Sequence, residues 1–231
     1  MRLHNVLQKS IRRLRKIIAV LIMNENEIRT LVEKVLSQMN EGGKKPIPIE
    51  ASARHVHLNK EAVETLFGVG AVLTKKRDLS QPGEFLSEQR LKLVTAKGEL
   101  ANVAVLGPER NAVQVELSMT DCRALGINAP INLSGDLSGA GDVYLVSDKA
   151  VLNARGSVIV AQNHVHMTPD DAEYYGVQDG QSVRVTAKTQ RPVTFDNVII
   201  RVNPNFSLAM HIDFDEANAC CLGKNSLGEI S

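Results

Sequence analysis

From residue 46 onward, short aliphatic runs alternate with clusters of glycine, proline, asparagine and aspartate. Such runs are typical of β-strands, and two of them flanking Lys97-Gly98 predict a hairpin. We expect strands at 47–58, 91–95, 101–105, 113–117, 143–146, 158–161, 183–187 and 198–202. We expect short helices near 60–67, 120–125, 169–175 and 214–222, each ended by a glycine, at Gly68, Gly126, Gly176 and Gly223. The pattern therefore predicts a mainly β protein.

The second half of this region repeats the organisation of the first. After the helices near 120–125 and 169–175 comes the same series: a glycine, an aliphatic residue, a turn and a strand. A repeat of short strands with capping helices indicates two related small β-barrels in tandem. We place the first barrel in residues 46–150 and the second in residues 151–231.

Residues 1–45 follow a different pattern. Apolar side chains recur at helical spacing through residues 3–21 and again through residues 28–39, which predicts two amphipathic helices. Gly42-Gly43, followed by Pro46, then forms a stop signal and linker. We interpret residues 1–45 as a helical appendage that docks onto a partner protein, a second copy or a membrane surface.

Charged residues are distributed unevenly only at the N-terminus. Residues 1–22 contain six lysines and arginines and no acidic residue, so the rest of the chain carries −5 within a net charge of +1. The first helix is therefore basic. Its purely apolar run, residues 17–23, is too short to span a membrane, and we expect no transmembrane segment. Met23 could itself be the start of translation.

Composition excludes several classes of function. A net charge near zero argues against nucleic-acid binding. Three cysteines, two of them adjacent, form no disulfide framework and favour a reducing, cytoplasmic setting. Segment 134–139 resembles a phosphate-binding loop in composition alone, and we interpret it as a turn.

The most informative motif is a His-Val-His string that occurs twice. His55 and His57 form the first copy, and His164 and His166 form the second, 109 residues later. Residues i and i+2 of a strand point to the same side, about 6–7 Å apart at the backbone. Each copy therefore places two imidazoles on one face, close enough to bind one metal ion.

Two further residues extend this donor set, and an arginine lies near it in sequence. His211 and Glu116 bring the donors to six, enough for two tetrahedral ions with three protein ligands and one open position each. That arrangement is typical of catalytic zinc. Which ligands share an ion stays open from the residues alone. Arg110, in a loop that begins Gly107-Pro108, is suited to bidentate binding of a phosphate.

Several segments together resemble the phosphate propanoyltransferases of the propanediol-utilisation type. The matching segments are 53–58, 77–83, 106–110, 114–116, 163–167 and 210–211. The resemblance covers nearly all of residues 46–223. It implies two tandem β-barrels, two Zn²⁺ ions per subunit, and exchange of coenzyme A (CoA) for phosphate on an acyl group.

The resemblance also implies roles for individual residues. One ion would be held by His55, His57 and Glu116, and the other by His164, His166 and His211. Arg110 would contact phosphate. Contacts to coenzyme A are implied for Ser52, Lys76, Arg77, Leu106 and Asn218. Some relatives carry an arginine where this chain has Ala104.

The N-terminal appendage fits the same resemblance. Residues 24–40 with the linker 41–45 are similar to the encapsulation peptides of relatives housed in bacterial microcompartments. This implies a cytoplasmic enzyme inside such a compartment, docked onto shell or core proteins, and a homo-oligomer. The basic helix at 1–22 departs from the usual short form.

The predicted reaction is direct attack of phosphate on the thioester of propanoyl-CoA or acetyl-CoA. The sequence offers five histidines in the β region and the loop residue Arg110, but no motif for an activated serine or cysteine nucleophile. Two alternatives remain at this point. One is a metal-dependent hydrolase, which also uses His-x-His pairs; the other is a non-catalytic metal-binding assembly module.

Overall fold

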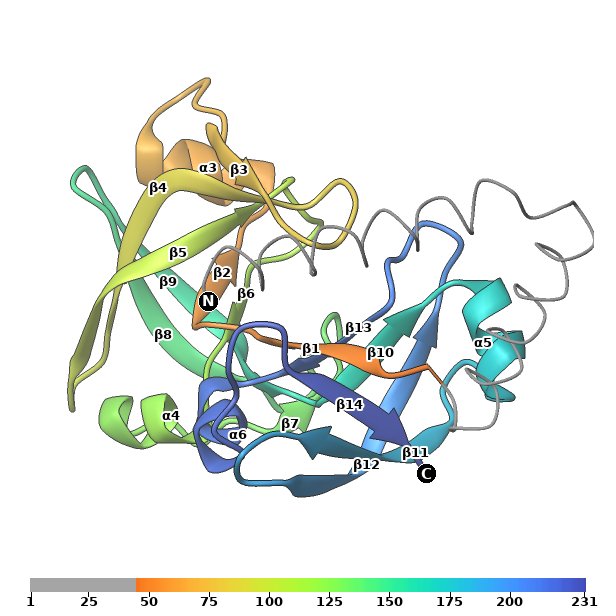
Figure 1. Cartoon of the computed structure of the whole chain (residues 1–231). Helices are drawn as coiled ribbons and strands as arrows, with labels where there is room; N and C mark the ends of the chain where they lie inside the picture. Colours follow the sequence, from red (N-terminus) through yellow and green to blue (C-terminus); the bar gives the residue numbers. More distant parts are fainter. Residues whose placement is uncertain (1–44) are drawn as a thin grey trace, which may run out of the picture. The chain divides into compact units, whose positions relative to one another are not determined.

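The computed structural model describes residues 45–231, and the predicted helices of the N-terminal appendage lie outside this range. Short strands of aliphatic residues close into two six-stranded barrels (Figure 1). The first ring runs, in pairing order, through β4 (Phe85–Val94), β5 (Glu99–Gly107), β2 (His55–His57), β6 (Gln114–Glu116), β9 (Val151–Ala161) and β8 (Gly141–Val146). Two further strands extend it at its margins: β3 (Lys75–Asp78) beside β4 and β7 (Ile131–Asn132) beside β9.

The second ring has the same order of equivalent strands. It runs through β11 (Ser182–Lys188), β12 (Val193–Val202), β10 (His164–Met167), β13 (Ala209–Ile212), β1 (Ile47–Ala51) and β14 (Leu227–Ile230). In both rings the His-Val-His strand lies between a parallel and an antiparallel neighbour. The predicted mainly β fold with two small, related barrels is confirmed.

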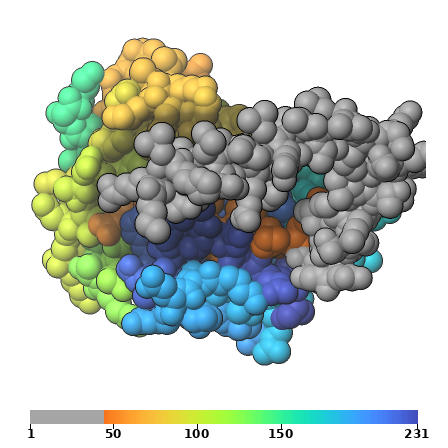
Figure 2. All heavy atoms as spheres, viewed as in Figure 1, coloured from red at the N-terminus to blue at the C-terminus, as the bar shows by residue number. Residues whose placement is uncertain are grey.

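The barrels exchange one strand each, which the sequence did not predict. β1 precedes β2 in the chain but pairs with β13 and β14 of the second barrel. β9 precedes β10 but pairs with β6 and β8 of the first barrel. In Figure 1 the orange β1 lies among the blue strands, and in Figure 2 orange atoms near residue 50 lie against blue ones. β1 therefore lies in the range predicted for the first barrel, 46–150, but pairs in the second. β9 lies in the range predicted for the second barrel, 151–231, but pairs in the first.

The exchange follows from where each strand buries its aliphatic side chains. Ile47 and Ile49 of β1 are buried in the core of the second barrel, with Val165, Val185 and others. Val158 and Val160 of β9 are buried in the core of the first barrel. Both strands carry aliphatic side chains that either core could bury, so neither sequence alone distinguishes one barrel from the other.

Within residues 45–231, four short helices cap the barrels, and each follows a strand that carries a candidate donor. They are α3 (Lys60–Phe67), α4 (Met119–Leu125), α5 (Pro169–Tyr175) and α6 (Phe214–Ala219). Their N-cap side chains, Asn59, Ser118, Thr168 and Asp213, each accept a hydrogen bond from a backbone N–H of the first turn. These caps start a helix shortly after each donor strand, so the chain leaves the site at a defined residue.

Most predicted elements are present, with four differences. β4, β9 and β12 begin six, seven and five residues earlier than predicted. The expected strand 47–58 is divided at residues 52–54, because β1 and β2 belong to different barrels. β3, β7, β13 and β14 were not predicted. Helix α6 ends at Cys220 rather than at Gly223, since Leu222 N–H already bonds back to Ala217. Among residues 45–231, no helix has the length and hydropathy that a membrane span requires.

Candidate metal centre

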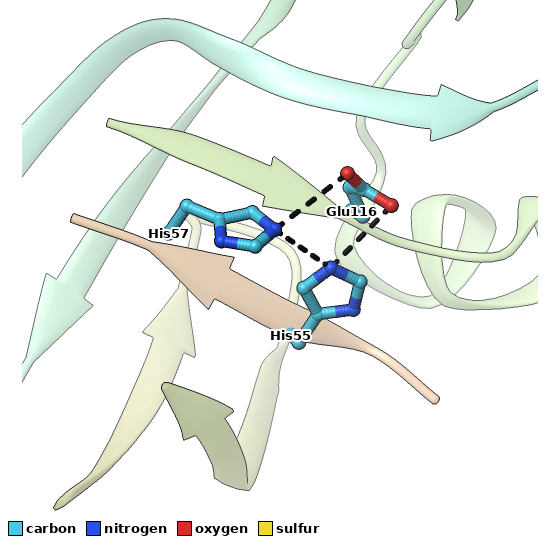
Figure 3. Close-up of side chains that lie close together, drawn as sticks. All are labelled: His55, His57 and Glu116. Carbon is cyan, nitrogen blue, oxygen red and sulfur yellow. Dashed lines mark hydrogen bonds and ion pairs between the residues drawn. The ribbon is translucent and has the colours of Figure 1, made fainter. Parts of the chain in front are cut away.

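The first donor cluster forms where β2 and β6 run side by side. His55 lies directly opposite Glu116 in the antiparallel ladder, and His57 points to the same side two residues along (Figure 3). The two His Nε2 atoms are 3.1 Å apart. Glu116 oxygens lie 3.4 Å from His55 Nε2 and 3.9 Å from His57 Nε2. Donors that share one tetrahedral ion at about 2.1 Å are about 3.4 Å apart, so this cluster fits a divalent ion.

Buried hydrogen bonds fix these donors in orientation. His55 Nδ1 donates to the Ala53 carbonyl at 2.8 Å, so in the neutral imidazole the Nε2 lone pair faces the cluster. Gln114 Nε2 donates to Glu116 Oε1 at 2.6 Å and to Ser134 Oγ at 2.8 Å. Such second contacts are what orients metal ligands in proteins.

The protonation states of the first cluster favour binding of a cation. Burial favours the neutral form of Glu116, but the neighbouring His55 and His57 outweigh it and hold the pKa of the carboxyl below its usual range. Burial and the positive charge of His55 lower the pKa of His57 to about 2. Burial would lower the pKa of His55 as well, but the Glu116 carboxylate outweighs it and raises that pKa. At neutral pH, Glu116 is therefore anionic and His57 is neutral.

The second cluster has the same construction in the second barrel. His164 lies directly opposite His211 on the antiparallel neighbour β13, as His55 lies opposite Glu116. The imidazole centroids of His164, His166 and His211 are 4.6–5.4 Å apart. His164 Nδ1 donates to the Gln162 carbonyl at 2.8 Å, two residues back, as His55 does to Ala53.

These three imidazoles are also poised as neutral donors. Burial, followed by the neighbouring histidines, lowers the pKa of His166 to about 2 and that of His211 to about 3. Burial likewise lowers the pKa of His164. Both ring nitrogens of His166, and Nδ1 of His57, are buried without a hydrogen-bond partner. Buried unpaired nitrogens are costly, and a bound ion would satisfy those that face the clusters. Among the described residues, the donors lie within 4.8 Å of one another only in the first cluster.

Both clusters line one cleft of about 750 Å³, together with Arg110. The Arg110 guanidinium donates to Ser134 Oγ at 3.1 Å and to Glu84 Oε1 at 3.0 Å, and its backbone N–H donates to the Leu58 carbonyl. Ser134 in turn connects to Gln114 and so to Glu116. A network of hydrogen bonds therefore holds a half-buried guanidinium beside the first donor cluster.

Comparison with known proteins identifies the family. A model of the phosphate propanoyltransferase family matches residues 48–223. The chain belongs to the phosphate propanoyltransferase family. Curated relatives of that name are 45% identical over 205 residues in Enterococcus faecalis, 47% over 210 in Leptotrichia buccalis and 47% over 198 in Citrobacter rodentium. These alignments cover 85–90% of this chain and 92–99% of the relatives. The name denotes an acyltransferase, so this family member is an enzyme.

The structure brings some of the predicted coenzyme contacts of a phosphate propanoyltransferase to the cleft and leaves others away from it. Ser52, Arg77 and Leu106 line the cleft. Lys76 and Asn218 are exposed outside the lining, and Lys76 pairs with Glu88 at 3.3 Å. Their contacts with coenzyme A stay predictions.

Several residues of this phosphate propanoyltransferase site were missed. Ser134 does lie in a turn, as expected, but its side chain bridges Arg110 and Gln114. Arg201 lies opposite His166 on β12 and lines the cleft. Gln81 exchanges two hydrogen bonds with the Ser207 backbone and reaches within 3.4 Å of His211. A short-range sequence signal exists only for Gln81, which lies within the 77–83 segment quoted above.

Proposed function

We propose that this chain interconverts acyl-CoA plus inorganic phosphate with acyl phosphate plus coenzyme A, using propanoyl or acetyl groups and two bound zinc ions. The observation that carries the proposal is the shared cleft: six buried or half-buried donors and a guanidinium line one cavity in a chain of the phosphate propanoyltransferase family. His55, His57 and Glu116 would hold one ion, and His164, His166 and His211 the other. Zinc supplies Lewis acidity for a thioester carbonyl and a soft partner for a thiolate.

The chain's own residues position the second substrate. Arg110 would bind and orient phosphate, held by Ser134 and Glu84. A phosphate oxygen attacks the thioester carbonyl carbon, the carbon–sulfur bond breaks, and the proton of the phosphate ends on the released thiol. Of the five N–H donors of a guanidinium, the two protein bonds leave others for the phosphate.

No cysteine lines this cleft, and the three cysteines are Cys122, Cys220 and Cys221. Three serines, Ser52, Ser80 and Ser134, line the cleft, and Ser80 is tested as the one that could instead form a covalent acyl-enzyme because its hydroxyl already bonds to a carboxylate. It lines the cleft, and its hydroxyl donates to Glu50 Oε2 at 2.5 Å. Direct attack predicts that Ser80→Ala keeps turnover, with sequential rather than ping-pong kinetics. Ping-pong kinetics together with loss of turnover in Ser80→Ala would refute direct attack.

The test of the reaction is a coupled assay for coenzyme A release from propanoyl-CoA and acetyl-CoA, with and without phosphate. Formation of acyl phosphate together with two zinc ions per chain supports the proposal. Free acid released without phosphate would instead indicate a metal-dependent hydrolase. Zinc binding without either product would indicate an assembly module. A His55→Ala/His57→Ala double variant should stay folded and lose turnover.

We further propose that residues 1–45 direct a homo-oligomeric enzyme into a bacterial microcompartment. The support is the amphipathic pattern of residues 24–40 and the following linker. Residues 46–231 form a separate compact unit, so the extension can be removed without cutting a barrel. In a host that makes compartments, a fluorescent protein fused to residues 1–45 should co-purify with shells, and one fused to residues 46–231 should not. Equal recovery of both fusions would refute this targeting role.

A further inference from the structure

Two rows of directly opposed residues cross the first barrel from the donor cluster to its outer strands. One row runs from Glu116 through His55 and Ala104 to Arg90, across β6, β2, β5 and β4. The other runs from His57 through Leu106 and Leu86 to Arg77, across β2, β5, β4 and β3. All of these residues line the cleft. Metal donors thus lie at one end of each row, small or apolar side chains in the middle, and an arginine at the other end.

The two arginines differ from the other cations of these outer strands. Lys75, Lys76 and Lys92 each pair with a carboxylate, namely Asp78, Glu88 and Glu99. Among residues 45–231, Arg77 and Arg90 form no ion pair. Arg90 is half-buried, and Nη1 donates to the Ser87 and Gln89 carbonyls at 2.6 and 2.7 Å. Its own strand therefore holds the guanidinium in place while its charge stays available.

The spacing of the rows identifies the kind of anion. Neighbouring strands are about 4.8 Å apart, so Arg90 is about 10 Å from His55 at the backbone and Arg77 about 14 Å from His57. A phosphate attacking at the donor cluster cannot reach that far. An anion held by Arg90 must instead be tethered to the reacting group by an uncharged arm that passes over Ala104 and Leu106. An acyl-CoA has this chemistry, with a thioester at one end, phosphates at the other and the pantetheine arm between.

We propose that Arg90, in the same cleft as Arg77, binds the nucleotide phosphates of the coenzyme A thioester. This inference rests on the proposed acyltransferase function and deepens it, because it names a coenzyme-binding residue outside the contacts that the family resemblance implies. Ala104 contributes by its small size: directly opposite Arg90, it leaves the space over β5 open for the arm. Charge-assisted bonds from a guanidinium suit phosphate oxygens.

The test compares Arg90→Ala with the wild-type full-length chain on two thioesters. For propanoyl-CoA, KM should rise about 10- to 100-fold, with kcat and the KM for phosphate nearly unchanged. For S-propanoyl pantetheine, which lacks the phosphates, the two proteins should have equal kcat/KM. Arg90→Lys should lie between them. Lys92→Ala is the matched control, since it removes a cation from the same strand that Glu99 already neutralises.

Two results would overturn the proposal. One is an unchanged KM for propanoyl-CoA in Arg90→Ala, and the other is an equal loss of kcat/KM on the pantetheine thioester, which would indicate a structural role. Calorimetric binding of coenzyme A to both proteins separates this proposal from the proposed reaction, because it needs no turnover. Weaker binding to Arg90→Ala supports the role of Arg90 even if no acyl phosphate forms, and equal binding refutes it.

Discussion

Replacing Glu116 by glutamine tests the first donor cluster as a metal site by removing the carboxylate of that cluster. Glutamine has nearly the same shape and keeps an oxygen that can accept the 2.6 Å hydrogen bond from Gln114. The change therefore removes charge and leaves the packing of β6 against β2 in place. If His55, His57 and Glu116 hold an ion, this substitution should weaken metal binding at that site and abolish most of the turnover.

The size of the effect follows from the distance and burial of the carboxylate. Glu116 is 9% exposed, and its Oε2 lies 3.4 Å from His55 Nε2. At an effective dielectric constant of about 20, a carboxylate and a unit positive charge at that distance attract by about 5 kcal/mol. The amide dipole of glutamine restores part of this attraction. We therefore expect the Kd for zinc at the first site to rise at least about 100-fold, which corresponds to about 2.8 kcal/mol.

The assay is competition between the metal-stripped protein and a chromogenic zinc chelator, read as two binding steps per chain. Glu99→Gln is the matched control, because it also removes a carboxylate but lies outside the cleft lining and both donor clusters. Only Glu116→Gln should weaken one of the two steps. An unchanged affinity and stoichiometry in Glu116→Gln would refute the ligand role of Glu116.

Three further predictions concern the stability of the protein. In the metal-free protein, burial lowers the pKa of His57, His166 and His211 to about 2, about 2 and about 3, so the unfolded chain binds more protons between about pH 3 and 6.5. The free energy of unfolding should fall with acidification in that window, by up to about 1.4 kcal/mol per pH unit for each of these three histidines. His55 acts in the opposite sense because its pKa is raised. A free energy of unfolding that stays constant with pH in urea titrations would contradict this prediction. Ile49→Ala, in the exchanged strand β1, should lower the free energy of unfolding by about 2–5 kcal/mol in urea titration, and a loss well below 1 kcal/mol would contradict the burial of this side chain in the second barrel. Gln81→Ala leaves the Ser207 N–H and carbonyl without their side-chain partner, and should lower the free energy of unfolding by about 1–3 kcal/mol in the same measurement. An unchanged free energy of unfolding would contradict a stabilising role for these two hydrogen bonds and would mean that water replaces them.

The repeated His-Val-His string predicted the donors because its geometry is local. Two histidines separated by one residue in a strand must share a face, whatever surrounds them. The same reasoning predicted the hairpin at Lys97-Gly98 and the four helix positions, which depend on turn residues and caps close in sequence. The sequence did not predict β3, β13 and β14, because strands of four residues with mixed composition show no clear alternation of apolar and polar positions.

The symmetry of the two donor clusters could not be read from the chain. In sequence, Glu116 and His211 stand outside the repeat and differ in type. In the structure they occupy equivalent positions, each directly opposite the first histidine of its string on the antiparallel neighbour. The repeat therefore extends to the third donor position, and only the residue at that position differs between the barrels.

By itself, the sequence determined the class of fold, the two histidine pairs and the family, because each of these depends on patterns within a few residues or on the joint resemblance of several segments. The tertiary structure decided which barrel each strand joins, which donors meet, and which arginines face the cleft. These depend on strand register and on burial between segments up to about 180 residues apart, such as Ile47 beside Gly228. A strand of alternating aliphatic residues can satisfy either core, so only packing against a specific neighbour selects one.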